Sequence, residues 1–67
     1  MLNDLTPRQW ELVRLVTTGL SNKSIAQRLG LQEGTVKIHL YNIYKKVGIP
    51  NRATLVMMAL KHNQEAA

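Results

Sequence analysis

The sequence predicts an all-α protein, a bundle of four short helices, and three observations support this. The chain has 67 residues, which is enough for one small domain. Glycine and proline divide it into four segments, and apolar residues recur at helical spacing in each. There is no cysteine, so the core has to come from close packing of Leu, Ile, Val, Met and the single Trp.

The first helix is expected over residues 7–18. Thr6 is its candidate N-cap, Pro7 stands at the first helical position, and Gln9 completes a capping box. Gly19 then ends the helix, because glycine readily adopts the left-handed conformation found just after a helix.

The next two helices are expected over 22–29 and 33–47. Ser21 is a candidate N-cap for the first of them, and a short turn that contains Gly30 joins the two. At about 100° per residue, one face of the helix 33–47 is continuously apolar. This predicted buried face consists of Val36, Leu40, Ile43 and Val47.

The fourth helix is expected over 51–62, with Asn51 as its N-cap. Its centre, residues 55–60, is apolar on all sides, which is typical of a helix buried on more than one face. One face can pack on the core, and the other needs a partner. The predicted domain spans 5–63, with short tails at 1–4 and 64–67.

Positive charge is concentrated in the middle of the chain. Residues 23–52 hold six of the nine basic residues and one of the four acidic residues, so they carry the whole net charge of +5. A basic stretch in a small domain favours a polyanionic partner, most often nucleic acid. On charge alone, a solvated surface is an equally good interpretation.

The two middle helices and their glycine-containing turn have the pattern of a helix-turn-helix. In that motif the second helix enters the DNA major groove and the first crosses the backbone. The face of helix 33–47 opposite its apolar stripe carries side chains suited to base edges. Lys37 can donate to guanine, Asn42 can pair with adenine, and Ile38 can contact a thymine methyl group. Tyr41 can donate to a base or a phosphate.

Phosphate contacts are expected at the start of the helix 22–29. Backbone N–H groups and the helix dipole favour an anion beside Ser21, Asn22 and Lys23. Lys45 points outward from the last turn of the helix 33–47 and is a further phosphate candidate.

Several stretches together resemble the LuxR-type (FixJ/GerE-like) helix-turn-helix domain, and the resemblance covers about residues 5–60. The matching residues are Leu5-Thr6-Pro7-Arg8, Gly19-Leu20-Ser21-Asn22-Lys23, Ile25-Ala26, Thr35-Val36-Lys37, His39, Asn42-Ile43, Lys46, Gly48 and Asn51-Arg52-Ala53.

The resemblance implies a four-helix domain that binds double-stranded DNA as a homodimer and regulates bacterial transcription. Such domains usually follow a response-regulator or quorum-sensing receptor region, and RNA polymerase is a further implied partner. The resemblance places Lys37, Ile38 and Tyr41 on the groove side and Thr35 beside a phosphate. It also assigns the dimer contact to the last helix, where the candidates are Val56, Met57 and Leu60.

Four positions depart from the family pattern. Gln9 replaces an acid, so an ion pair made by that acid is expected to be lost. Ser24 replaces a common Glu, which removes a capping box. Gln32 is a poor N-cap, and Gly34 lies in the first turn of the helix 33–47. Two interpretations follow: the first turn of that helix is soft, or Gly34 lets the backbone approach a phosphate closely.

Other functions have less support in the sequence. No catalytic constellation, phosphate-binding loop, metal-ligand cluster or cofactor site is apparent, so we expect a non-enzyme without a small-molecule ligand. The longest apolar run has six residues, which predicts no membrane span and a cytoplasmic location. The main alternative is a protein–protein interaction module with the same fold. In that case Tyr41 and Ile38 would form a protein-binding patch. Taken residue by residue, the alternatives to DNA contact are a solvated Lys37, a Tyr41 ring packed on a neighbouring turn, and an Asn42 that bonds within the domain.

Overall fold

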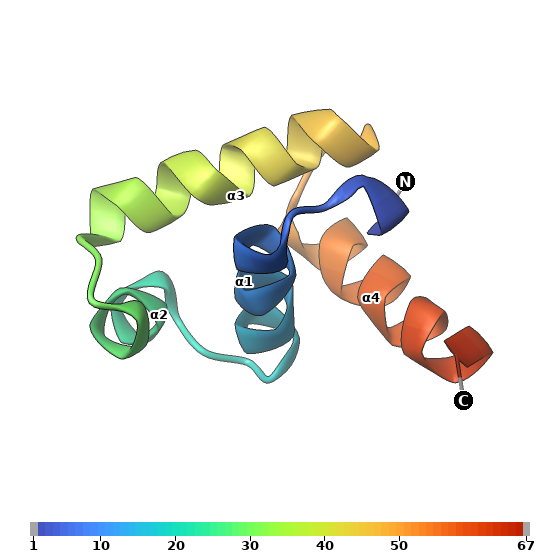
Figure 1. The fold of residues 1–67 in the computed structure, drawn as a ribbon, viewed down its shortest axis with the longest axis horizontal. Helices are drawn as coiled ribbons and strands as arrows, with labels where there is room; N and C mark the ends of the chain where they lie inside the picture. Colours follow the sequence, from blue (N-terminus) through green and yellow to red (C-terminus); the bar gives the residue numbers. More distant parts are fainter. Residues whose placement is uncertain (1, 67) are drawn as a thin grey trace.

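The computed structural model describes residues 2–66 of the chain, with side chains described for 2–63, and all regular secondary structure in that part is helical (Figure 1). A short 3-10 helix, η1 (Leu2–Asp4), precedes four α-helices. These are α1 (Pro7–Thr17), α2 (Asn22–Leu29), α3 (Glu33–Val47) and α4 (Arg52–Ala66). The predicted all-α fold with four helices is confirmed.

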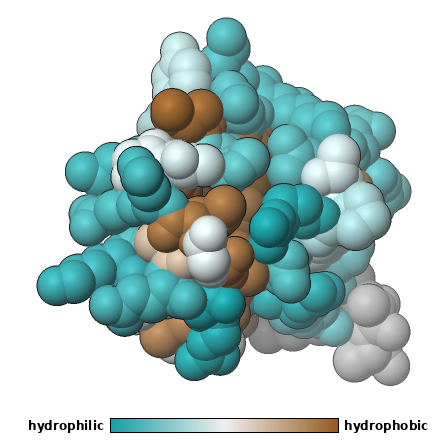
Figure 2. All heavy atoms as spheres, turned by 60° about the vertical axis from the view of Figure 1, so that its left-hand side comes forward, coloured by the Kyte–Doolittle hydropathy of each residue, from teal (hydrophilic) through white to brown (hydrophobic). Residues whose placement is uncertain are grey.

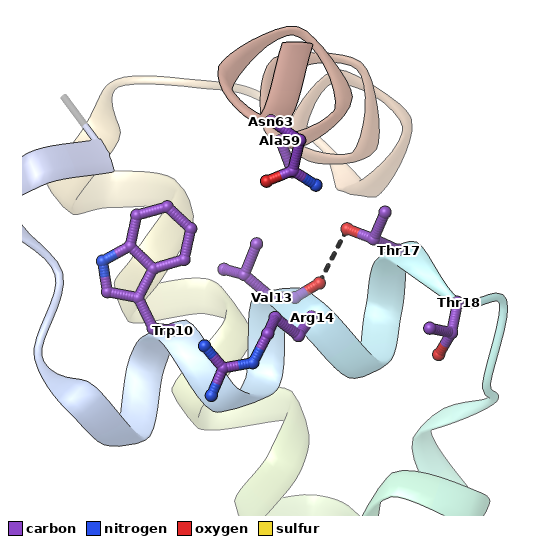
Figure 3. Close-up of a pocket in the computed structure, with 7 residues that line it drawn as sticks. All are labelled: Trp10, Val13, Arg14, Thr17, Thr18, Ala59 and Asn63. Atoms are coloured by element: carbon purple, nitrogen blue, oxygen red, sulfur yellow. Dashed lines mark hydrogen bonds between the residues drawn. The ribbon is translucent and has the colours of Figure 1, made fainter. Parts of the chain in front are cut away.

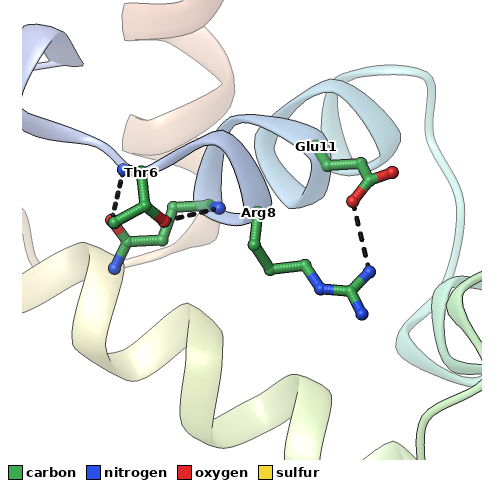
Figure 4. Close-up of polar contacts among 4 residues, drawn as sticks. Thr6, Arg8 and Glu11 are labelled. Atoms are coloured by element: carbon green, nitrogen blue, oxygen red, sulfur yellow. Dashed lines mark hydrogen bonds and ion pairs between the residues drawn. The ribbon is translucent and has the colours of Figure 1, made fainter.

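The capping signals in the sequence explain where the helices begin. The Thr6 hydroxyl accepts a hydrogen bond from the Gln9 N–H at 3.1 Å, and the Thr6 N–H donates to Gln9 Oε1 at 2.9 Å (Figure 4). In the next turn, Arg8 Nη1 lies 3.2 Å from Glu11 Oε1. At α4, Asn51 Oδ1 accepts from the Thr54 N–H at 2.9 Å, so Asn51 caps the helix as predicted.

The chain ends differ from the expected tails. Helix α4 continues to Ala66 instead of ending near residue 62, because the residues after His62 include no glycine or proline that would stop it. At the other end, Leu2 lies in η1 and is only 4% exposed, since η1 packs against α3. Its apolar side chain therefore joins the core instead of a tail. Residues 1 and 67 lie outside the described residues.

The core takes at least one fully buried side chain from every α-helix. Leu12, Ile25, Val36, Ile43 and Leu55 are each 0% exposed. The apolar face predicted for α3 is also buried in full. Figure 1 shows α1 at the centre, with α2 and α4 on opposite sides of it and α3 crossing over the top. The opposite face of α3 is therefore left to solvent.

Candidate nucleic-acid interface

Helices α2 and α3 form the helix-turn-helix. Gly30 follows α2 with φ 69°, and Leu31 N–H then donates to the Ala26 carbonyl at 2.8 Å, which closes the helix end and turns the chain. Helices α2 and α3 pack directly on each other. The fully buried side chains of Ile25 on α2 and Val36 on α3 belong to one shared core. This packing fixes which face of α3 points outward.

The outward face of α3 brings together the four predicted base-reading side chains. Ile38 is 62% exposed and Tyr41 is 60% exposed, which is unusual for large apolar residues, and Lys37 and Asn42 are exposed beside them. The Asn42 side chain makes no hydrogen bond to another described residue, contrary to the alternative that it bonds within the domain. The face therefore combines donors, an amide and apolar contacts, all of which remain accessible.

Two of these side chains have neighbours on the same helix. Lys37 Nζ lies 3.8 Å from Glu33 Oε2, and both side chains are well exposed. Lys45 Nζ lies 5.4 Å from the centre of the Tyr41 ring, within cation–π range. Lys45 thus remains on the outward face, as predicted, next to the candidate base-contacting tyrosine.

The start of α2 has the Ser21 cap that the sequence predicted, together with a bond to Arg52 that it did not. Ser21 is exposed, but its hydroxyl is engaged as the N-cap: it accepts from the Ser24 N–H at 3.1 Å and donates to Ser24 Oγ at 3.2 Å. Asn22 is half-buried, and its Oδ1 accepts from Arg52 Nη1 at 2.6 Å. Lys23 is exposed. Thr35, in the first turn of α3, is half-buried.

Two polar links across the fold were not predicted from the sequence. Lys46 Nζ donates to Gln9 Oε1 at 3.1 Å, so the glutamine at the acid's position keeps a hydrogen bond to a charged partner. Arg52 donates to Asn22 and also, through Nη2, to the Leu20 carbonyl. Both links join residues more than 28 positions apart. The surplus of positive charge in 23–52 gave no indication that these two cations bond within the domain.

The end of the molecule that carries α2 and the start of α3 is mainly hydrophilic, with hydrophobic side chains visible among the polar ones (Figure 2). Such a surface suits a polar, charged partner that also offers apolar contacts. This is the character of the DNA major groove, where phosphates flank base edges and thymine methyl groups.

Helix α4 has the two apolar faces that its sequence predicted. Leu55 and Ala59 are buried in the core, whereas Met57 is 71% exposed, Leu60 is 49% exposed and Val56 is half-buried. The exposed side has no counterpart within the domain.

A shallow cavity of about 240 Å³ lies between α1 and α4 (Figure 3). The side chains that line it belong to α1, the residue after it, and α4: Trp10, Val13, Arg14, Thr17, Thr18, Ala59 and Asn63. Trp10 was expected in the core, but it is half-buried at the core's edge, with its ring centre 5.1 Å from that of His62. None of the residues that line the cavity belongs to α3.

Tyr44 lies on the inner part of α3, beside the start of α4. Burial raises the pKa of its hydroxyl above the ordinary value of 10.0, and the positive charge of Arg52 opposes that rise. The Arg52 guanidinium is therefore within electrostatic reach of α3 as well as bonded at α2.

Within the described part of the chain, no helix combines the length and the hydropathy needed to cross a membrane.

Comparison with known proteins agrees with this geometry. Residues 3–59 match the family described as bacterial regulatory proteins, luxR family. The chain is 52% identical over 52 residues to the Mycobacterium tuberculosis protein Rv0890c, whose name includes the words "HTH-type transcriptional regulator". It is 43% identical over 58 residues to the transcriptional regulatory protein MctR of Rhizobium johnstonii. It is also 43% identical over 51 residues to the nitrate/nitrite response regulator protein NarL of Escherichia coli.

These matches cover most of this chain and little of the relatives. They take in 78%, 87% and 76% of the chain, but 6% of Rv0890c, 27% of MctR and 24% of NarL. The chain thus corresponds to one domain of each. With the family model matching most of its length and the helix-turn-helix in place, the chain belongs to the LuxR family of bacterial regulatory proteins.

Proposed function

We propose that this chain binds specific sequences of double-stranded DNA as the output domain of a bacterial transcription regulator, of the response-regulator or quorum-sensing type. In this proposal α3 lies in the major groove, where Lys37, Ile38, Tyr41 and Asn42 contact base edges. The observation that carries the proposal is the outward face of α3, where two large apolar side chains stay exposed between a lysine and an amide.

Phosphate contacts supply the sequence-independent part of the affinity. Lys23 and Lys45 are exposed and flank the proposed reading face. At the start of α2, Ser21 and Asn22 contribute through their backbone N–H groups, because their side-chain oxygens are engaged within the domain. Thr35 meets a phosphate at the start of α3.

A homodimer through α4 completes the proposal. The exposed strip of Met57 and Leu60, with Val56 beside it, supports a second copy as the partner, because a symmetric apolar contact would cover the same strip on both. Such a dimer presents two copies of α3 to half-sites about one DNA turn apart, which is about 10 base pairs. The full regulator would act in the cytoplasm, where it meets DNA and RNA polymerase.

The proposal is tested by letting the protein choose its own site. Duplexes are selected from a random-sequence pool with the purified chain, and binding to a selected duplex and its scrambled form is measured by fluorescence anisotropy at several salt concentrations. We expect a strong preference for the selected duplex and an affinity that falls steeply with salt. Equal binding to both duplexes would contradict specific recognition, and no binding even at low salt would favour a protein-interaction module.

A further inference from the structure

Arg52, the first residue of α4, reaches across the domain to the beginning of α2. Its Nη1 donates to Asn22 Oδ1 at 2.6 Å, and its Nη2 donates to the carbonyl oxygen of Leu20. The side chain is half-buried, so the two bonds are partly shielded from water. Hydrogen bonds from a charged guanidinium are stronger than those between neutral groups. Two donors on one planar group also restrict how the side chain can lie against its acceptors.

The two acceptors lie on either side of Ser21, the N-cap of α2. The Ser21 hydroxyl and carbonyl accept from the N–H groups of Ser24 and Ile25. The N–H groups of Asn22 and Lys23 are the remaining donors of the first turn, because a helix offers its first amides no intrahelical acceptor. The function proposed above assigns the Asn22 amide to a phosphate, and the Lys23 amide lies next to it in the same turn.

Packing connects α4 to α2 mainly through α1. Helix α1 packs on both, and Figure 1 shows it lying between them. The Arg52 fork adds a side-chain link that bypasses α1. One cation therefore joins the start of α4 to the beginning of α2.

We infer that Arg52 is a positioning residue for DNA binding: it contacts no base, and it holds the first turn of α2 where its free amides meet a phosphate. This inference rests on the function proposed above. Because the fork starts on α4, it also fixes the phosphate-binding corner relative to the helix that carries the proposed dimer contact. An arginine is needed, because a lysine ammonium lacks the planar pair of donors that reaches both acceptors at once.

The test compares Arg52→Lys and Arg52→Gln with the unaltered chain on the selected duplex. Arg52→Lys keeps the charge and loses the fork, so it separates positioning from simple electrostatic attraction. Arg8→Gln is the matched control for Arg52→Gln, since it removes one positive charge from an exposed arginine on α1. Circular dichroism and urea unfolding identify the conditions in which each variant is fully folded.

Under those conditions we expect both Arg52 variants to bind about tenfold more weakly, as follows from the loss of a hydrogen bond to a charged group. Arg8→Gln should not change the affinity by a comparable amount. A purely structural role for Arg52 would lower the urea midpoint and leave the affinity of the folded protein unchanged.

A double-mutant cycle keeps the inference testable if Arg52→Gln does not fold. Asn22→Ala removes one acceptor and leaves the arginine in place, and it is combined with Arg52→Lys. We expect the double variant to lose no more affinity than the weaker-binding single variant, because both changes break the same link. Fully additive losses would overturn the inference.

The inference and the proposed function fail in different ways. Wild-type affinity in folded Arg52→Lys would overturn the positioning role while leaving DNA binding intact. Failure of the unaltered chain to prefer its selected duplex would overturn the proposed function and the inference together.

Discussion

At the scale of single residues, Lys37 is the side chain from which we expect the largest contribution to specificity. Its ammonium group is 3.8 Å from the Glu33 carboxylate in the free protein, and both side chains are exposed. Exposed pairs of this spacing on a helix contribute only about 0.3–0.5 kcal/mol. Lys37 can therefore leave Glu33 for a guanine at little cost.

We expect Lys37→Ala to weaken binding to the selected duplex by about 1–3 kcal/mol and to relax the preference at one base pair. Lys45→Ala is the matched comparison, because a lost phosphate contact weakens binding to the selected and scrambled duplexes alike. Both effects are measured by anisotropy on a set of single-base-pair variants of the selected site. An equal loss on both duplexes for Lys37→Ala would reassign this lysine to a phosphate.

Tyr44 gives the domain a specific response to alkaline pH. Burial raises the pKa of its hydroxyl in the folded protein, with Arg52 opposing the rise, so the unfolded chain loses this proton first as the pH increases. The contribution of Tyr44 to the free energy of unfolding is constant below the ordinary tyrosine pKa of about 10, and it falls as the pH rises above that value. Urea unfolding from pH 8 to 11 should show a smaller decline for Tyr44→Phe than for the unaltered chain. Tyr41→Phe, which changes an exposed hydroxyl, is the control, and identical profiles for the Tyr44 variant and the unaltered chain would contradict this assignment.

At the scale of elements, α3 begins with the weakest first turn of the helix-turn-helix. Gln32 stands at its N-cap and makes no side-chain capping bond, whereas Ser21 caps α2. Gly34 follows in the same turn, where a methyl group would meet nothing within 4 Å. The soft start expected from the sequence is thus matched by the absence of a side-chain cap.

We expect Gly34→Ala to raise the free energy of unfolding by up to about 1 kcal/mol, because alanine costs less backbone entropy in a helix. Gly30→Ala is the contrasting variant: it also has open space around it, but its φ of 69° is unfavourable for alanine, so it should destabilise the domain. Both are measured by urea unfolding. A destabilised Gly34→Ala would show that the first turn of α3 has another conformation in solution.

The helices themselves were largely predictable, because their signals are local. Thr6, Ser21 and Asn51 mark three helix starts, and the buried face of α3 follows from residue spacing alone. The exposure of the proposed base-reading side chains could also be predicted, since they lie on the opposite face of the same helix. The end of α4 was predicted too early, because the polar residues after His62 are as compatible with a continued helix as with a loop.

The links through Lys46 and Arg52 could not be predicted from these signals. Each depends on how two distant segments are rotated and spaced, to within an ångström or so, and a local pattern carries no such information. A basic residue near a predicted interface suggests a phosphate contact by default. Here two such residues are engaged by Gln9 and Asn22 instead, and the set of cations left for DNA is correspondingly smaller.

At the scale of the whole molecule, one face of α4 lies outside the domain's own core. The relatives are several times longer than this small domain. In a full-length regulator, the dimer contact proposed here therefore acts together with any contacts made by the other parts of the protein. The exposed Met57 and Leu60 make α4 the natural place to test self-association.

We expect Met57→Glu to weaken binding to a duplex with two half-sites by about a hundredfold, because joint binding of two copies contributes that order of avidity. Binding to a single half-site should change little, since Met57 lies on α4 and not on the α3 reading face. Arg8→Gln, which changes the net charge by the same amount, is the control. Equal losses of Met57→Glu on the one-site and two-site duplexes would contradict dimerisation through α4.

The position of Trp10 makes the docking of α4 visible by spectroscopy. It is the chain's one tryptophan, it lies on α1, and its ring is 5.1 Å from that of His62 on α4. Its fluorescence therefore reports on the contact between these two helices, whereas far-ultraviolet circular dichroism reports on all the helices together. If α4 separates before the other helices unfold, the two signals will change at different urea concentrations. If they coincide, the proposed dimer helix and the DNA-reading helices melt as one cooperative unit.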